Sequence, residues 1–284
     1  MGQHFLISRS LAERIVSVAS IQNTETVFEL GTGLGVLTGA LCLKAGHVTS
    51  VEIDRRLAAR ARAALSKFEN LRLECGDGLA VKACGGRSAS ATVSTSHCDI
   101  FASNLPYSHS RRAVEQLASA GFGRCIAMVQ KEFALKLLAA TKPPPSSEGR
   151  GNDRRAISVI AQYCFEIRIV MDVPAACFEP RPQVDSVVIE MIRKRTLDDA
   201  QILMINRIFS YRRKRLSSIL RMVRDGDPGS GGAGGGDPTR LRVESAPAAP
   251  GTAADDYDRL RIDDLGIVDV VELAERLLGR RKMI

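Results

Sequence analysis

The 284-residue sequence has no apolar run that approaches the length of a membrane-spanning helix, which is about 20 residues. Residues 1–9 lack the basic segment and following apolar stretch of a secretory signal peptide. None of the seven cysteines stands at CxxC spacing from another, so neither a zinc site nor a redox motif is indicated. We interpret these scattered cysteines as reduced, buried thiols, and we expect a cytoplasmic protein that binds no metal and no membrane.

The residues that are present are ordinary for a globular protein with a basic surface. Hydrophobic residues make up 45% of the chain and charged residues 25%, and the length suffices for one large domain and a smaller one, each with its own core. The formal net charge is +8. A basic balance favours polyanionic partners, because lysine and arginine that neutralise phosphates release condensed counterions. Charge alone therefore indicates a preference for nucleic acid.

Short apolar segments alternate with helical patterns through the first 130 residues. The expected helices are 9–21, 35–45, 55–67 and 110–120, and the expected strands are 27–30, 48–53, 71–75, 99–103 and 125–129. Such alternation is typical of βαβ units with a parallel sheet. Two more expected strands, 165–173 and 186–192, are separated by a Pro-rich turn too short for a helical crossover, so this pair should be antiparallel. The prediction is an α/β fold with a Rossmann-like, seven-stranded, mostly parallel sheet.

Beyond about residue 196 the pattern becomes helical. Apolar positions recur through 199–224, which we expect to be helical, and a last amphipathic helix is expected at 267–279. The first of these stretches also carries a run of four cations: Arg212, Arg213, Lys214 and Arg215. A charge run is most often a solvated helix face, and phosphate contact is the alternative.

Three stretches of low complexity interrupt the regular patterns. Residues 85–97 and 142–153 are expected to be loops, and 226–256, dominated by Gly, Ala, Pro and Asp, is typical of a flexible insertion. We therefore predict a cofactor-binding catalytic domain over residues 1–194 and a small all-α domain over 195–284, with the Gly-rich insertion inside the second domain.

A glycine-rich turn follows the first expected strand of the sheet and opens a helix. Its glycines are Gly31, Gly33 and Gly35, which allow a tight turn and close approach of a ligand to the backbone. Glu52 ends the next strand, where a carboxylate can accept hydrogen bonds from ribose hydroxyls, and Asp77 follows the third strand, where it can reach an adenine amino group. Together these residues predict a nucleoside site at the carboxyl edge of a parallel sheet.

The spacing of the glycines favours S-adenosylmethionine over NAD as the cofactor. The third glycine of the dinucleotide fingerprint would fall at Val36, and a pyrophosphate needs the helix N-terminus that this fingerprint leaves free. Glu29 lies just before the glycines, and we expect its negative charge to suit a cationic methionine-like group better than a phosphate.

The residues that point to the reaction are Asn104, Leu105, Pro106 and Tyr107, at the end of the fourth expected strand. An amide oxygen and a backbone carbonyl can together accept both hydrogens of a planar amino group and direct its lone pair at a sulfonium methyl. Pro106 constrains the turn and has no N–H to interfere, and Tyr107 can stack on a base. Methyl transfer would then be a direct in-line displacement that depends on positioning.

These motifs resemble those of the KsgA-type ribosomal RNA adenine dimethyltransferases over nearly the full chain. The resemblance rests on Gly2–Leu6, Glu29–Gly35, Asn104–Tyr107 and, most specifically, Val173–Pro174 with Phe178–Val188. It implies that the cofactor site is lined by His4, Leu6, Gly31, Glu52, Asp77 and Asn104. It also implies that the flipped adenine stacks between Tyr107 and Phe178, and that the basic run Arg212–Arg215 holds ribosomal RNA.

The function that this resemblance implies is N6-dimethylation of two adjacent adenines near the 3′ end of small-subunit ribosomal RNA. The expected partner is the immature small subunit, with a role in its biogenesis, and the protein is expected to be a monomer. One alternative is a large-subunit adenine methyltransferase of the Erm type, against which the Phe178–Val188 segment argues. The other is a non-catalytic, RNA-binding assembly factor, against which intact Glu52, Asp77 and Asn104–Tyr107 argue.

Overall fold

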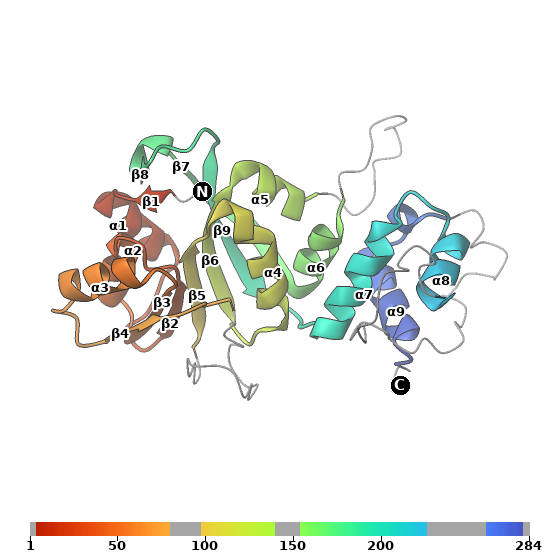
Figure 1. Cartoon of the computed structure of the whole chain (residues 1–284), viewed down its shortest axis with the longest axis horizontal. Helices are drawn as coiled ribbons and strands as arrows, with labels where there is room; N and C mark the ends of the chain where they lie inside the picture. The colour runs from red at the N-terminus through yellow and green to blue at the C-terminus, as the bar shows by residue number, and fades with distance from the viewer. Residues whose placement is uncertain (1–3, 80–97, 140–153, 226–259, 281–284) are drawn as a thin grey trace. The chain divides into compact units, whose positions relative to one another are not determined.

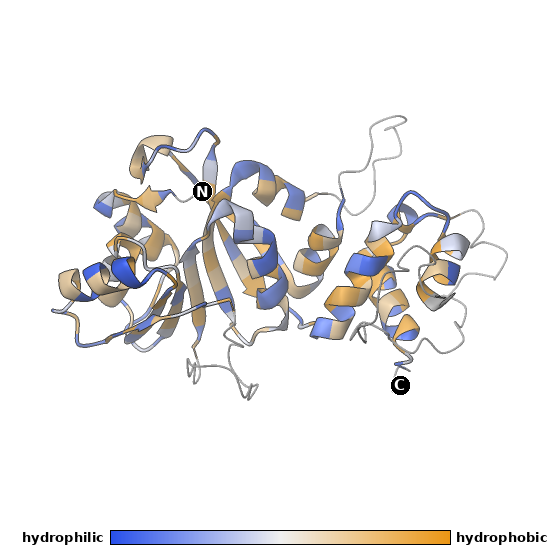
Figure 2. Ribbon diagram, viewed as in Figure 1, coloured by the Kyte–Doolittle hydropathy of each residue, from blue (hydrophilic) through white to orange (hydrophobic). Residues whose placement is uncertain are grey.

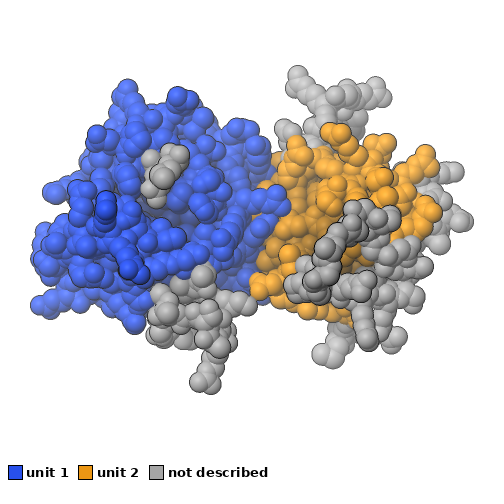
Figure 3. Space-filling model, in the orientation of Figure 1, with its two compact units in different colours: residues 1–137, 164–196 blue, residues 138–163, 197–284 orange. Residues whose placement is uncertain are grey.

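The computed structural model describes residues 4–79, 98–139, 154–225 and 260–280. The expected loops 85–97 and 142–153 and the expected insertion 226–256 lie outside these residues. The chain divides into two compact units (Figure 3). Unit 1 contains residues 1–137 and 164–196, and unit 2 contains 138–163 and 197–284. Residues 138–163 thus group with the C-terminal helices, whereas the boundary expected from sequence placed them in the first domain.

Seven strands of unit 1 form one sheet in the order β4-β3-β2-β5-β6-β9-β7 (Figure 1). Their bounds are β2 Thr26–Leu30, β3 His47–Glu52, β4 Leu71–Cys75, β5 Ile100–Asn104, β6 Arg124–Gln130, β7 Phe165–Val173 and β9 Ser186–Arg193. The five strands from β4 to β6 pair in parallel, while β9 is antiparallel to both β6 and β7. This confirms the predicted Rossmann-like, mostly parallel sheet.

The order of the strands places a topological switch point between β2 and β5. The chain runs outward from β2 to β3 and β4, and then returns to the other side of β2 with β5. In open α/β sheets the connections leave the sheet in opposite directions at such a point, which opens a crevice at the carboxyl ends of the strands. The glycine turn after β2 and Asn104 at the end of β5 both lie at this crevice.

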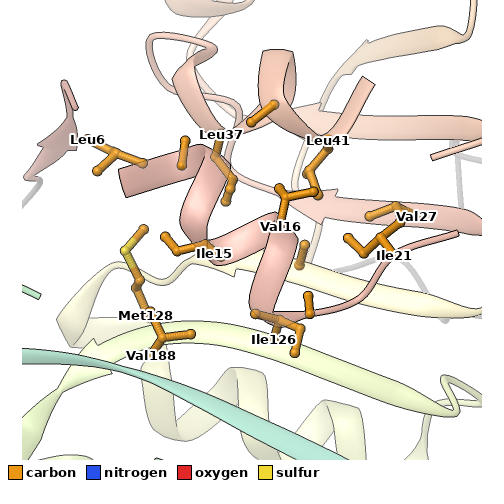
Figure 4. Close-up of a cluster of buried hydrophobic side chains, with 14 of the residues drawn as sticks. Leu6, Ile15, Val16, Ile21, Val27, Leu37, Leu41, Ile126, Met128 and Val188 are labelled. Carbon is orange, nitrogen blue, oxygen red and sulfur yellow. The ribbon is translucent and has the colours of Figure 1, made fainter. Parts of the chain in front are cut away.

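Both faces of the central strands are buried, as a parallel sheet requires. On one face, α1 (Arg9–Val18) packs against α2 (Val36–Cys42), and both cover the central strands (Figure 4). This cluster includes Ile15, Leu37, Val27 and Ile126. The central strands are mostly hydrophobic along their length (Figure 2), because successive side chains of a strand face opposite layers that are both apolar.

The remaining helices of unit 1 each follow a strand of the sheet, and the alternation predicted all but the last of them. They are α3 (Arg55–Ala64), α4 (Ser110–Ser119) and α5 (Lys131–Leu137). Asp54 begins α3 by accepting hydrogen bonds from the N–H groups of Arg56 and Leu57, as an N-cap residue does. Helix α5 was not predicted from the sequence.

A second, two-stranded sheet joins the N-terminal segment to the late motif. Strand β1 (Phe5–Leu6) pairs antiparallel with β8 (Phe178–Glu179), and the Ile7 N–H donates to the Cys177 carbonyl at 2.9 Å. Two-residue strands carry no periodicity, so the sequence did not predict this pairing. It brings residues 4–6 beside residues that lie more than 170 positions later in the chain.

Unit 2 is helical in the residues that the structure describes. It contains most of α6 (Ala156–Cys164) together with α7 (Asp199–Ser210), α8 (Leu216–Asp225) and α9 (Ile267–Leu277). Asp198 and Gln201 form a capping box at the start of α7, which packs against α9. Arg154 is buried and donates hydrogen bonds to the carbonyls of Leu265 and Gly266. Among the described helices, none has the length and apolar character that a transmembrane span would require.

The expectation of one helical stretch over 199–224 was wrong. The backbone leaves the helix after Ser210 and resumes one at Leu216, so the basic run lies in the turn between α7 and α8. Within that turn the N–H groups of Arg212 and Lys214 donate to carbonyls three residues back, which tightens the last turn of a helix. Cations at positions 212 and 215 would also repel one another on a continuous helix.

Candidate active site

A pocket lies at the switch point of the sheet, at the carboxyl ends of β2, β3 and β5. We call it the edge pocket, and it is lined by His4, Phe5, Gly31, Gly33, Glu52, Asn104, Leu105, Pro106 and Tyr107. Four segments contribute: the N-terminal residues, the glycine turn, the end of β3 and the turn after β5. Parallel strands present their carboxyl ends at one edge, which is why residues from the glycine turn and from the turn after β5 meet there.

The glycine turn needs glycine for two different reasons. Gly31, Gly33 and Gly35 have φ values of +83°, +55° and +79°, in the left-handed region that favours glycine. A Cβ at Gly33 would lie 3.2 Å from the ring of Phe5, and one at Gly35 would lie 2.9 Å from Leu65. Gly31 has open space at the corresponding position. Gly31 and Gly33 therefore form the wall of the edge pocket, whereas Gly35 begins α2 and does not line it.

Glu52 supports the glycine turn and also lines the edge pocket. Its side chain is 3% exposed. The carboxylate accepts hydrogen bonds from the Gly33 N–H at 2.8 Å and from the Asp54 N–H at 3.0 Å. A carboxylate has about four lone-pair sites, so this group can still accept hydrogen bonds from hydroxyl groups of a ligand.

Asn104 presents an acceptor because a hydrogen bond from its amide nitrogen fixes the orientation of the side chain. Its Nδ2 donates to the His4 carbonyl at 2.9 Å, which fixes the amide with the Oδ1 atom on the other side. The Leu105 N–H donates to the Met128 carbonyl of β6, and the Pro106 carbonyl accepts from the His109 N–H. The Asn104 oxygen is thus an oriented acceptor at the rim of the pocket.

Tyr107 lies beside Asn104 at the start of a short 3₁₀ helix, Tyr107–His109. Its hydroxyl is 2.6 Å from the Ser186 Oγ atom, and its ring lies 5.3 Å from the His4 ring, centroid to centroid. The Nδ1 atom of His4 is 2.7 Å from the Pro180 carbonyl, to which it donates. The aromatic ring is therefore held by contacts from the N-terminal segment and from β9.

Glu29 does not occupy the place that its charge suggested. It is fully buried beneath the glycine turn, where Oε2 accepts hydrogen bonds at 2.6 Å from the hydroxyls of Thr38 and Ser50. Burial raises the pKa of this carboxyl to about 7, although the two hydroxyls oppose the shift. The residue does not line the edge pocket, so its charge is no argument for a cationic ligand. Strand alternation explains the difference, because successive residues of β2 face opposite sides.

Three other expected site residues lie outside the edge pocket. Leu6 and Phe178 pair across β1 and β8, and their side chains are 5% and 3% exposed within the hydrophobic cluster of unit 1. Asp77 is exposed in the turn after β4, where Oδ1 accepts a hydrogen bond from the Leu79 N–H. That turn follows Cys75, the partner of Glu52 in the sheet, so Asp77 stands at the same edge. A role for Phe178 in stacking stays a prediction.

Sequence reasoning assigned no role to Phe5 or Ser186, although both lie in the motifs that carried the resemblance. Phe5 lines the edge pocket against Gly33, and Ser186 contacts Tyr107. The role of Phe5 could have been suspected from the sequence, because it is an aromatic residue between two expected site residues, His4 and Leu6. Ser186 offered none, because a serine at the start of a strand has no distinctive pattern.

The four cations of the basic run differ in exposure. Arg212 forms an ion pair with Asp263 at 3.0 Å, and the two side chains are 18% and 25% exposed. Arg213, Lys214 and Arg215 are exposed. The first cation therefore serves the packing of unit 2, and the other three face solvent.

Comparison with known proteins gives a consistent set of similarities. The family model described as ribosomal RNA adenine dimethylase matches residues 1–226. A protein named ribosomal RNA small subunit methyltransferase A from Thermotoga neapolitana is 35% identical over 223 residues, covering 78% of each chain. One of the same name from Moorella thermoacetica is 32% identical over 231 residues, covering 77% of each.

Solved structures are similar as well. A dimethyladenosine transferase from Plasmodium falciparum matches with a TM-score of 0.60 and 25% identity, covering 77% of this chain and 74% of the other. The 23S rRNA methyltransferase ErmE matches with a TM-score of 0.54 and 25% identity, covering 96% of this chain and 99% of the other.

Proposed function

The chain belongs to the ribosomal RNA adenine dimethylase family, and we propose that it methylates the 6-amino groups of two adjacent adenines near the 3′ end of small-subunit ribosomal RNA. The methyl donor is S-adenosylmethionine. The observation that carries this proposal is the orientation of Asn104, whose Nδ2 is bound to the His4 carbonyl so that its oxygen can accept from a target amine.

Two features of the edge pocket support its assignment as a nucleoside site. Gly31 leaves open space where a side chain would stand, so a ligand can approach the backbone closely. The buried Glu52 carboxylate, which already binds two backbone N–H groups, would hold the ribose hydroxyls of the cofactor. When bound, the cofactor supplies an electrophilic methyl group. Asp77, at the same edge, is proposed to contact the adenine ring of the cofactor.

Asn104 and its neighbours prepare the target amine for attack. The Asn104 oxygen accepts one N–H of the adenine amino group, and the Leu105 carbonyl accepts the other, because the Pro106 carbonyl is already bound to the His109 N–H. Both contacts direct the nitrogen lone pair out of conjugation with the ring. The nitrogen would then attack the methyl group that the bound cofactor supplies, with the cofactor's sulfur as the leaving group, and the excess proton would leave for solvent. Tyr107 stacks on the base and holds it in line.

Unit 2 is proposed to contact the substrate RNA. Arg213, Lys214 and Arg215 are exposed, and exposed cations bind phosphates without reading the sequence of the bases. We assign the RNA-contacting role to residues 195–284 and the catalytic role to 1–194, and we expect a cytoplasmic monomer that acts on an immature small subunit during its biogenesis.

The test is methyl transfer from labelled S-adenosylmethionine to purified ribosomal subunits that lack the modification, followed by mapping of the labelled bases. We expect two methyl groups on each of two adjacent adenines of the small-subunit RNA. Label in the large subunit alone would favour a second candidate, the Erm-type reaction, which the likeness to ErmE over 96% of this chain recommends for testing. No label in either subunit, with no cofactor binding in a calorimeter, would indicate a non-catalytic assembly factor.

A further inference from the structure

Ser186 stands behind the aromatic residue of the edge pocket without lining the pocket itself. Its Oγ atom is 2.6 Å from the Tyr107 hydroxyl, and the residue is 2% exposed. Ser186 begins β9 and pairs with Gln130 of β6 on one side and with Val173 of β7 on the other. A residue that pairs with two strands moves little, so the hydroxyl is a fixed point inside unit 1.

The opposite part of the Tyr107 side chain is restrained by His4. The two rings lie 5.3 Å apart at an angle of 35°, and the His4 ring is bound to the Pro180 carbonyl. His4 also accepts from Asn104 through its own carbonyl. The tyrosine ring is thus restrained at its tip by Ser186 and along its side by His4.

We propose that Ser186 is a positioning residue for methyl transfer, because its hydroxyl fixes the Tyr107 ring in the orientation on which the target adenine stacks. This inference rests on the proposed function. A ring that is free to rotate about its side-chain bonds would lose that freedom each time a base entered, and this loss would oppose the reactive geometry. A hydrogen bond at the far end of the ring removes the rotation beforehand. Ser186 acts through Tyr107, because it does not itself line the edge pocket.

The experiment is a double-mutant cycle with Tyr107→Phe, Ser186→Ala and the double variant. The rate of methyl transfer to unmodified small subunits is measured at saturating RNA and cofactor. Each single variant removes the same hydrogen bond, so we expect equal decreases in kcat of about three- to tenfold, the range for one neutral hydrogen bond. The double variant should be no slower than either single variant. In Ser186→Ala the KM for S-adenosylmethionine should not change, because Ser186 does not line the edge pocket.

Two further variants separate positioning from stability. Ser186→Thr keeps the hydroxyl and should restore most of the kcat that Ser186→Ala loses. Thr26→Val is a control at another strand, because it removes a half-buried hydroxyl that donates to Asp99 at 2.8 Å, at the amino end of β2. It should lower the melting temperature and leave kcat unchanged. If Ser186→Ala fails to fold, the test uses Tyr107→Phe instead. This substitution must lower kcat by the same factor in the wild-type protein and in the Ser186→Thr variant.

Several outcomes would overturn the proposal. Decreases that multiply in the double variant, an unchanged kcat in Tyr107→Phe, or an equal decrease in the Thr26→Val control would each show that Ser186 does not act through Tyr107. A wild-type chain that labels no small-subunit adenine would instead overturn the proposed function itself, so the two failures are distinguishable.

Discussion

The edge pocket and the basic turn between α7 and α8 both contain residues that the sequence assigns to function. In the edge pocket, residues far apart in the chain converge: His4, Gly33, Glu52 and Asn104 line one cavity. In the basic turn, four adjacent cations separate, since Arg212 binds Asp263 while its three neighbours face solvent. Strand ends in a parallel sheet must meet at one edge. A run of like charges has no such constraint.

The largest effect is expected at Asn104, one of the residues that meet at the edge pocket. Asn104→Ala should lower kcat by about 10²–10³-fold, the usual effect of deleting one preorganised hydrogen-bonding group at a reacting centre. Methyl incorporation into small subunits measures this. Asn70→Ala is the matched control, because the Asn70 amide also donates to backbone carbonyls, those of Cys42 and Ala45. The Asn70→Ala control should lower stability and leave kcat unchanged. Equal kcat values for Asn104→Ala and Asn70→Ala would show that Asn104 takes no part in the reaction.

The pH dependence of stability distinguishes two places for the Glu29 carboxylate, in the pocket or in the core beneath the glycine turn. Its pKa in the folded protein is about 7, raised from 4.5 by burial, so the folded state binds a proton that the unfolded state has released. The protonated Glu29 carboxyl therefore adds to the free energy of unfolding below pH 4.5, and this contribution is lost as the pH rises to 7. The size of this loss is about 3 kcal/mol.

Glu29→Gln should remove this loss while keeping the size of the side chain. Urea unfolding of the wild type and the variant at pH 5 and pH 7.5 measures the difference. Glu13→Gln, at an exposed position of α1, removes the same charge and should leave the pH dependence of the wild type unchanged. Equal slopes for wild type and Glu29→Gln would contradict the assignment of Glu29 to the core.

Glu52 should affect the cofactor rather than the chemical step. Glu52→Ala removes a carboxylate that lines the pocket and accepts from the Gly33 N–H. We expect the dissociation constant of S-adenosylmethionine to rise about 10- to 100-fold, since hydrogen bonds to a charged group contribute about 1.5–3 kcal/mol. Calorimetric titration measures it, with Glu13→Ala as the surface control. Unchanged cofactor affinity would mean that the ribose is bound elsewhere.

The smallest effects concern the basic turn and compare neighbouring arginines. Arg212→Ala should lower stability by about 1 kcal/mol, because a partly exposed ion pair contributes little more. It should not change how RNA binding depends on salt. Arg213→Ala should do the reverse, lowering the slope of log affinity against log salt by about 0.7–0.9 for each phosphate that the side chain neutralises. Thermal melts and RNA titrations at several salt concentrations separate the two, and a reduced slope in Arg212→Ala would restore the basic run as one surface.

Local patterns were sufficient for most of the sheet and for part of the pocket. The strand 71–75 was predicted with the bounds that β4 has, and the antiparallel pairing of β7 with β9 was correctly expected from a connection too short for a crossover. Gly31, Gly33, Glu52 and Asn104 were assigned to one site because strand ends and glycine turns are visible in the sequence. These features depend on residues a few positions apart.

The sequence by itself determined the α/β fold, the family and the edge at which the site forms. Only the tertiary structure decided which side chains face the pocket: Glu29 and Phe178 are buried away from it, and Phe5 lines it. It also decided the β1–β8 pairing, the contact of Ser186 with Tyr107 and the ion pair of Arg212. Periodicity and turn chemistry are short-range and act within one element. The direction and partner of a single side chain depend on elements that are distant in the chain and meet only in the folded protein.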